Sequence, residues 1–368
     1  MANIFVRSPF YVSKKDLGGT AAYGILTIQV DGATVYTLRK NISQTYVLFE
    51  IAELLRDYLN IAYDPDTNFY QTHSETYQTS IQLYTSANAT VGSPEVVNGF
   101  IIDAYGNFEE GSNPTTTAGY MQSNDIIYKL ADSDIRIPVD RNNTTSVTFL
   151  YQNNIVYSKL IAPSLAYVFE YVSNGVNAYD SFKDRVVQLE GSYEPNECII
   201  DFLDEYEIFE VDQINIATTD GLRIVKVNTI EECKYKPAKI SFINKFGGLQ
   251  DLWFFRKSIK QLNVTKEEYK RFEIGLTGTY DTLKHPRKTF NIQGAKSITL
   301  NTGYVDESYN EVVEQMMQSE YVWMEQDTVI TPMVVNASSL TYKTGVNDKL
   351  VDYTLSFSYA FDNIQNIR

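Results

Sequence analysis

Apolar and polar residues alternate along many short stretches of the chain. Residues 26–30 read Leu-Thr-Ile-Gln-Val, the dipeptide Asp31-Gly32 follows, and a second alternating run returns from Val35 to Leu38. Alternation with a period of two on both sides of an Asp-Gly pair predicts a two-stranded β-hairpin. Further turns between apolar runs are predicted at Asn98-Gly99, Asn174-Gly175 and Asp220-Gly221.

The stretch from Lys239 to Ser258 has the most distinctive pattern. Five aromatic residues surround a Gly247-Gly248 break: Phe242, Phe246, Trp253, Phe254 and Phe255. Apolar runs on either side of paired glycines predict a strand, a tight turn and a second strand. No side chain in this stretch offers a nucleophile, a transition-metal ligand or a tight phosphate site, so the stretch is interpreted as built for packing.

A helical period occurs in two stretches. Between residues 47 and 60, apolar residues recur at helical spacing at Leu48, Ile51, Ala52, Leu55 and Leu59. Between residues 306 and 319, they recur at Tyr309, Val312, Val313, Met316 and Met317, with two acidic residues at the positive end of the predicted helix. The two methionines are compatible with an adaptable contact surface. A stripe that faces the core is the favoured interpretation.

Closely spaced strands predict a mainly β fold: tandem β-sandwich-like domains with a few short helices. We expect an N-terminal β-rich domain over residues 1–170, either one elaborated sandwich or two small ones. A central β-sandwich-like domain is expected over 171–275 and an α+β domain over 276–368. The polar stretch from about 85 to 117 predicts a loop insertion or a surface lobe that contacts a neighbour.

Charge and composition narrow the classes of partner. The 368 residues include 31 Lys and Arg against 46 Asp and Glu, a net charge of −15. This balance repels nucleic-acid phosphate and anionic lipid, so neither is an expected partner. No apolar run reaches transmembrane length and no signal-peptide pattern opens the sequence, so we expect synthesis in the cytoplasm. The acidic run from Glu194 to Asp212 is interpreted as a solvated face, because the ligand spacing of a Ca²⁺ loop is absent.

The sequence gives no basis for a metal or cofactor site. Its two cysteines and two histidines are far apart: Cys198, Cys233, His73 and His285. A zinc site needs three or four such ligands and would have to gather all of them from distant places. Two cysteines also cannot form a disulfide framework. We therefore expect no metal and no cofactor.

No catalytic signature is present either. The paired carboxylates Asp204-Glu205 and Glu231-Glu232 are adjacent, and neighbours on a strand point to opposite faces rather than toward one substrate. The segment Gly106 to Gly111 lacks the Lys-Ser/Thr of a phosphate loop and carries two acids. The sequence predicts no catalytic residue, and the protein is not expected to be an enzyme.

The last part of the chain contains a series of blocks that are not catalytic signatures. They are Glu231–Tyr235, Phe242–Gly248, Ser297–Glu307 with the following helix, Glu320–Met324, Thr331–Val335, Tyr342–Thr344 and Lys349–Ala360. Over about residues 225–368 the chain resembles virion tail proteins of tailed phages that infect Bacteroidota, including the crAss-like group. This resemblance implies a β-rich hub, collar or ring subunit. Such a subunit forms a homo-oligomer, docks to other tail or portal-complex proteins, and is assembled in the host cytoplasm into the virion tail.

Aromatic residues supply the candidate contacts for such an assembly. The candidates are Trp253, Phe254, Phe255, Tyr304 and Trp323, although burial in a core is the commoner role for any one of them. The alternative is a receptor- or glycan-binding protein at the tail tip. In that case Tyr105 and Phe108, in a polar loop, would stack on sugar rings. Fibre-like proteins usually show repeats or trimer-forming heptads, and this sequence shows neither.

Overall fold

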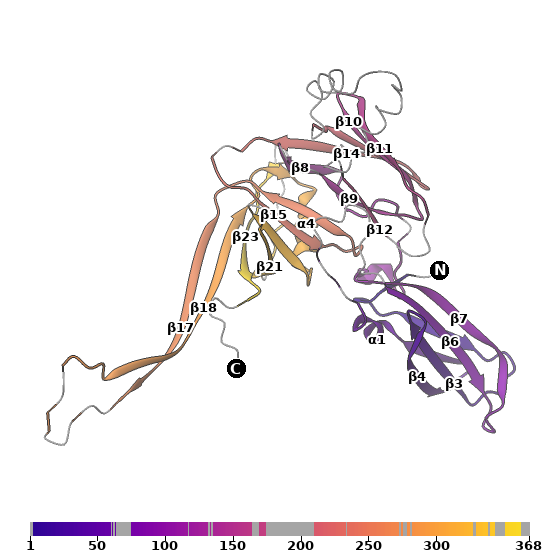
Figure 1. Cartoon of the computed structure of the whole chain (residues 1–368). Coiled ribbons are helices and arrows are strands. Elements are labelled where there is room, and N and C mark those ends of the chain that lie inside the picture. Colours follow the sequence, from indigo (N-terminus) through magenta and orange to yellow (C-terminus); the bar gives the residue numbers. More distant parts are fainter. Residues whose placement is uncertain are drawn as a thin grey trace, which may run out of the picture. The chain divides into compact units, whose positions relative to one another are not determined.

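The structure is a computed structural model that describes residues 3–59, 61, 63, 75–116, 118–131, 133, 135–163, 169–173, 210–232, 234–271, 274, 278–279, 282–326, 329–337, 339–342 and 350–361. Strands dominate this part of the chain, which confirms the prediction of a mainly β fold (Figure 1). The chain forms two compact units. Unit 1 contains residues 1–231 and 243–251, and unit 2 contains residues 232–242 and 252–368.

This division differs from the predicted one at residues 170 and 275. The expected boundary at 170/171 falls within a strand, β12 (Phe169–Ser173). The chain also enters unit 2 at residue 232, returns to unit 1 for residues 243–251, and enters unit 2 again. A boundary of this kind is set by the packing of one hairpin and leaves no change in composition along the sequence.

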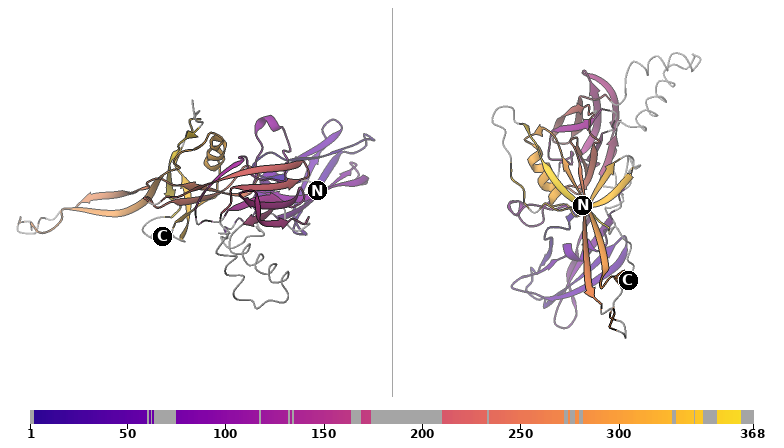
Figure 2. Two further views of the ribbon diagram at one scale, coloured as in Figure 1. Left: turned by 90° about the horizontal axis from the view of Figure 1, so that it is seen from above. Right: turned by 90° about the vertical axis from the view of Figure 1, so that its left-hand side faces the viewer.

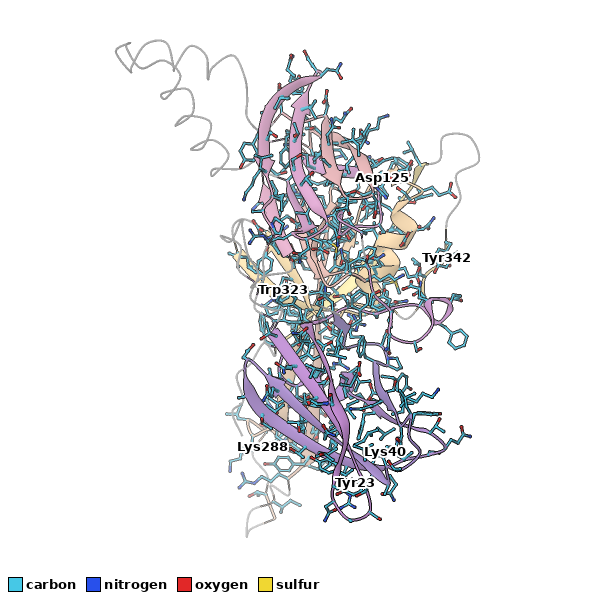
Figure 3. All side chains as sticks on the ribbon, turned by 90° about the vertical axis from the view of Figure 1, so that its right-hand side faces the viewer. Tyr23, Lys40, Asp125, Lys288, Trp323 and Tyr342 are labelled. Carbon is cyan, nitrogen blue, oxygen red and sulfur yellow. The ribbon has the colours of Figure 1, made fainter. Side chains whose placement is uncertain are left out.

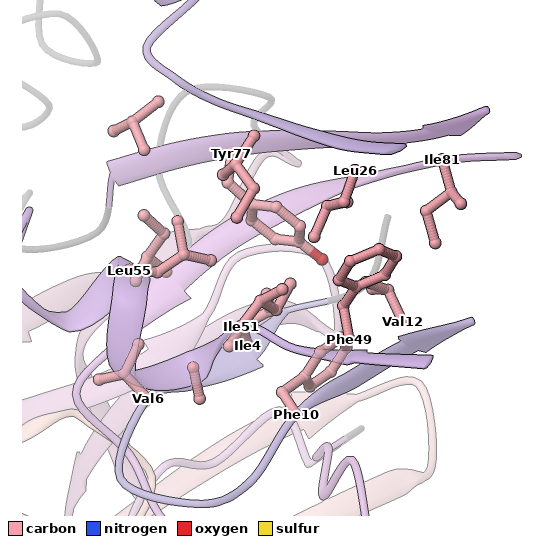
Figure 4. Close-up of a cluster of buried hydrophobic side chains, with 14 of the residues drawn as sticks. Ile4, Val6, Phe10, Val12, Leu26, Phe49, Ile51, Leu55, Tyr77 and Ile81 are labelled. Carbon is pink, nitrogen blue, oxygen red and sulfur yellow. The ribbon is translucent and has the colours of Figure 1, made fainter. Parts of the chain in front are cut away.

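The first half of unit 1 contains a five-stranded sheet and a two-stranded sheet. The large sheet pairs its strands in the order β1 (Ile4–Phe5), β7 (Thr90–Ile102), β6 (Glu75–Tyr84), β3 (Tyr23–Val30) and β4 (Ala33–Asn41). The small sheet pairs β2 (Tyr11–Lys15) with β5 (Tyr46–Glu50), and α1 (Ala52–Arg56) follows β5. Both sheets contribute apolar side chains to one core (Figure 4), including Leu26 and Ile81 from the large sheet and Val12 and Phe49 from the small one.

Turn chemistry explains the hairpin between β3 and β4. Asp31 and Gly32 both have positive φ, 48° and 79°, as a tight two-residue hairpin turn requires. The side chain of Asp31 also accepts hydrogen bonds from the backbone N–H and the hydroxyl of Thr76, at 3.1 and 2.7 Å. The predicted hairpin at Asp31-Gly32 is confirmed.

Three local predictions in this half are wrong. The expected helix over 47–60 is helical only from Ala52 to Arg56, because residues 46–50 pair with β2 as a strand. Asn98-Gly99 is not a turn but lies within β7, where Gly99 pairs with Tyr77 of β6. The polar stretch 85–117 is not one insertion, since residues 90–102 form β7. In each case pairing with a distant strand overrides the local preference.

The second half of unit 1 has its own core. Its five-stranded sheet pairs β11 (Asn154–Leu160), β10 (Thr144–Tyr151), β13 (Gln213–Thr218), β14 (Gly221–Ile230) and β8 (Ile126–Leu130). A second sheet pairs β12 with β9 (Arg136–Asp140). Buried residues from both sheets form one cluster, among them Phe149, Ile214 and Val139. A turn does connect β13 and β14 as predicted, but it consists of Thr219 and Asp220, one residue before the predicted Asp220-Gly221, and Gly221 begins β14. Asn174-Gly175 lies outside the described residues.

The aromatic-rich stretch forms the predicted strand, turn and strand. Its strands are β15 (Ala238–Ile243) and β16 (Leu249–Phe254), and the turn between them belongs to unit 1. Gly247 has a φ of 82°, and a side chain there would overlap Ile102. Both the backbone conformation and the lack of space therefore favour glycine at this position. Buried Asn244 holds the turn: its Oδ1 accepts the N–H groups of Phe246 and Gly248, at 3.0 and 3.1 Å.

Tyr171 of β12 also contacts this hairpin, because its hydroxyl accepts the N–H of Leu249 at 3.0 Å. Burial raises the pKa of Tyr171. A folded pKa above the unfolded value of about 10 gives stability that is present below pH ~10 and lost as the pH rises further.

We therefore expect the free energy of unfolding to fall above pH ~10, and to fall less steeply in Tyr171→Phe. This variant should also lose about 1–3 kcal/mol at neutral pH, since the Leu249 N–H loses its acceptor. Urea titrations at pH 8, 10 and 11 measure both effects, with exposed Tyr46→Phe as the control. Equal slopes for Tyr171→Phe and the wild type would contradict the assignment.

Unit 2 is built on one seven-stranded sheet. Its strand order is β16, β15, β20 (Val322–Gln326), β21 (Val329–Val335), β23 (Thr354–Tyr359), β18 (Arg287–Asn301) and β17 (Ile259–Lys270). A small sheet pairs β19 (Val305–Asp306) with β22 (Leu350–Val351), and α4 (Tyr309–Met317) follows β19. The core contains an edge-to-face pair, Phe254 and Phe357, with ring centroids 5.8 Å apart.

The predicted helix over 306–319 is confirmed as α4. Val312, Val313 and Met316 are fully buried, whereas Met317 is half-buried. The helical stripe therefore faces the core, as the favoured interpretation expects. The opposite side of α4 presents glutamates to solvent.

Candidate functional site: an exposed β-hairpin

The most unusual surface of unit 2 is the hairpin formed by β17 and β18. The two strands pair antiparallel from Ile259 opposite Thr299 to Lys270 opposite Arg287. β17 is the edge strand of the sheet, and every residue of β17 is exposed. In Figures 1 and 2 the hairpin extends beyond the other strands of its own unit. A long exposed edge strand is a template for pairing with another chain.

The two ends of β18 have different surroundings. Residues 297–301 pair with β23, residues 297–299 also pair with β17 on the other side, and Ile298 and Leu300 are buried. Residues 287–296 pair only with β17 among the described strands, so this part is a two-stranded ribbon. Ribbons of two strands have marginal stability in water, and packing against another surface stabilises them.

The ribbon exposes apolar side chains. Leu262 and Val264 are each 53% exposed, and Tyr269, Phe290 and Ile292 are each exposed by close to half. Tyr269 and Phe290 form an edge-to-face pair with centroids 5.5 Å apart, which stabilises the ribbon from one side. Leu262 and Val264 lie on the other face. An apolar row on an extended ribbon indicates a contact surface.

The two faces of the ribbon differ in charge. Alternation along β17 places one set of residues on the same face: Lys260, Leu262, Val264, Lys266, Glu268 and Lys270. Two cations of β18 share this face, Lys296 opposite Leu262 and Arg287 opposite Lys270. These eight residues are called the basic face. It carries five cations and one acid, and Glu268 is paired with Lys266 at 3.1 Å. The opposite face carries Lys288 (Figure 3) and Glu267.

The shift in register between Thr265 and Glu267 adds a bulge on β18. Asn291 lies in this bulge with a φ of 49°, a conformation that asparagine tolerates better than most residues, and its Nδ2 donates to Glu267 at 3.3 Å. Bulges increase local twist, so the outer part of the ribbon turns relative to the inner part. The basic face offers cations and aliphatic groups for binding.

The candidate contact residues named above lie in different places. Tyr105 and Phe108 belong to unit 1: Tyr105 is half-buried with the Arg7 guanidinium 5.0 Å from its ring, and Phe108 is 97% exposed on the 3₁₀ turn η1 (Phe108–Glu110). In unit 2, Tyr304 is 65% exposed just before β19, and Trp323 of β20 is half-buried and stacked on Tyr321.

Two further candidates are core residues. Phe254 and Phe255 are at most 2% exposed, so neither can contact a partner in the folded unit. Trp253 is half-buried, stacks on Phe255 at 6.3 Å and lies 5.9 Å from the Lys239 ammonium. Aromatic richness therefore marks the interior here. The exposed hairpin has a weaker signal, the alternation of lysines with Leu262 and Val264.

A cavity in unit 1 is a further candidate binding site. It has a volume of about 210 Å³ and is lined by Gln29, Thr76, Tyr77, Gln78 and Asn98 together with Gly32, Gly99 and Phe100. It is smaller than the usual 300–1,000 Å³ of small-molecule pockets. Among the described residues, no three His, Cys, Asp or Glu side chains gather as metal ligands would. His73, Cys198, Cys233 and most of the acidic run 194–212 lie outside the described residues.

Comparisons with known proteins leave the chain without an assigned family. No protein-family model matches the sequence, and no curated protein matches it. One solved structure, described as concerning host cell surface retention of a 1.5-MDa bacterial ice-binding adhesin, aligns over 97% of this chain and 92% of its own. The identity is 8% and the TM-score is 0.17, too low to carry an argument. Neither described helix is long and apolar enough to cross a bilayer.

Proposed function

We propose that this chain is a non-enzymatic structural protein of a phage virion, a hub, collar or ring subunit of the tail. It oligomerises and docks to other tail or portal-complex proteins after synthesis in the host cytoplasm. The observation that carries the proposal is the β17–β18 hairpin, an edge ribbon that leaves Leu262 and Val264 half-exposed. The resemblance of residues 225–368 to tail proteins supports the same function.

The energetics favour an assembly role for the hairpin. A two-stranded ribbon with exposed apolar side chains gains stability when a partner covers it, at about 25 cal/mol for each Å² of apolar surface removed from water. The exposed edge of β17 also offers backbone donors and acceptors to a further strand. An assembly subunit uses both.

The experiment measures mass in solution by size-exclusion chromatography with light scattering. The protein is measured alone and mixed with the other virion proteins of its source. We expect a closed oligomer or a defined complex, and Leu262→Asn with Val264→Asn should weaken it about 10- to 100-fold, or ~1–3 kcal/mol. The control changes Leu222 and Ile224 to Asn, two similarly exposed residues on β14 of unit 1. A wild-type monomer under every condition would refute the proposal and redirect work to glycan arrays.

A further inference from the structure

Charge is distributed unevenly along the chain. β17 and β18 contain six Lys and Arg residues and two glutamates, a net charge of +4. Since the whole chain carries −15, the remainder carries −19. Residues 297–342, which begin inside β18, contain seven Asp and Glu residues and neither Lys nor Arg. A basic hairpin is thus followed at once by an acidic segment of the same unit.

The acidic segment forms a surface around α4. Glu311 and Glu314 lie on the side of α4 away from buried Val312 and Met316, and Glu307 lies in the turn that precedes the helix. Together with Asp306, exposed Tyr304 and exposed Tyr342, they are called the acidic face. Tyr342 (Figure 3) is 59% exposed, and its hydrogen bond to Glu314 raises its pKa. The acidic face thus combines carboxylates with two exposed aromatic rings.

We propose that the basic face of one copy docks on the acidic face of a second copy of this chain. The inference rests on the proposed function and names the partner of the hairpin. Five cations on the basic face meet four carboxylates, while Leu262 and Val264 meet the rings of Tyr304 and Tyr342. Opposite charges across an interface steer association and fix its register.

The two faces are different surfaces of one unit, so the contact is heterologous. Each copy offers its hairpin to one neighbour and its α4 surface to another. Such head-to-tail contacts close into a ring when the rotation permits, and otherwise form filaments. The hairpin extends beyond the strands of its own unit (Figure 2), which suits a contact with a neighbouring copy.

The test exchanges charge between the two faces. One variant carries Lys260→Glu, Lys266→Glu and Lys296→Glu, and a second carries Glu307→Lys, Glu311→Lys and Glu314→Lys. Each alone places like charges on both faces, so self-association should fall at least 10-fold. Mixed together they restore opposite charges at every contact, so oligomers of alternating variants should return. Raising salt from 0.05 to 0.5 M should weaken the wild-type oligomer and the mixed oligomer alike.

The matched control reverses Lys15, Lys226 and Lys236, three exposed lysines that belong to neither face, and should associate like the wild type. Circular dichroism confirms folding, and Glu311→Gln with Glu314→Gln replaces the second variant if that one unfolds. If the wild type oligomerises but both reversed variants do so equally well, the inference fails and the proposed function stands. If the wild type never associates, both fail. DNA binding of the wild type and of the Lys→Glu variant is measured as well. If the wild type binds DNA and the Lys→Glu variant loses that binding while its self-association is unchanged, nucleic acid is the partner of the hairpin and the inference is overturned.

Discussion

Replacing Asn244 with aspartate is expected to destabilise unit 1 by about 3 kcal/mol or more, although the two side chains have the same shape. The Nδ2 of Asn244 donates to the carbonyl oxygen of Met121 at 2.7 Å and to Oε1 of Gln250 at 3.1 Å. Aspartate puts an oxygen there, so three acceptors face one another without a proton. The side chain is fully buried, so no water relieves the repulsion.

Urea denaturation followed by circular dichroism measures this loss. Exposed Asn263 of β17 provides the control, because Asn263→Asp should change the free energy of unfolding by less than about 0.5 kcal/mol. The loss in Asn244→Asp should shrink at lower pH, since a protonated carboxyl can donate one hydrogen bond. Equal stability of the two variants at pH 7 would show that the hydrogen bonds from Asn244 Nδ2 to Met121 and Gln250 do not stabilise unit 1.

Local turn chemistry was readable from the sequence. Asp31-Gly32, Gly221 and Gly247 lie between apolar runs, and each has a positive φ that few other residues adopt. The helix α4 was readable for the same reason, because four buried positions at helical spacing identify one face. These signals lie within about ten residues of one another, so a linear pattern contains them.

Strand pairing was not readable in the same way. Residues 46–50 have the apolar content of a helix, yet pairing with β2, more than 30 residues earlier, makes them a strand. The candidate site shows the same limit. Whether β17 is covered depends on which strands follow it in the sheet, and the order β23, β18, β17 leaves it at the edge. The prediction from aromatic content instead named Phe254 and Phe255 as contact residues, and both are buried in the core.

Buried polar contacts are the least visible of all from sequence. Arg136 of β9 and Asp251 of β16 are 115 residues apart, yet Arg136 Nη2 lies 2.9 Å from Asp251 Oδ1. Burial acts to lower the pKa of Arg136, but the charge of Asp251 and the contact with Tyr63 outweigh it, so the pKa of the guanidinium rises. The ion pair therefore keeps a charge inside unit 1 that solvent does not stabilise.

Removing one partner of this pair should be more costly than removing both. Arg136→Met leaves the Asp251 carboxylate without its counter-charge, and we expect a loss of about 3 kcal/mol in the free energy of unfolding. Arg136→Met combined with Asp251→Leu removes both charges and should recover part of that loss. Urea titrations of the wild type, both single variants and the double variant complete the cycle.

The solvent-exposed pair of Arg223 and Asp125, 2.6 Å apart, supplies a matched cycle in the same unit. Both of these side chains are about half-exposed, so their coupling should be no more than about 1 kcal/mol. A coupling at Arg136 and Asp251 as small as the exposed one would mean that solvent reaches the pair. A larger one would show that charge, as well as the Asn244 turn, stabilises residues 243–251 within unit 1.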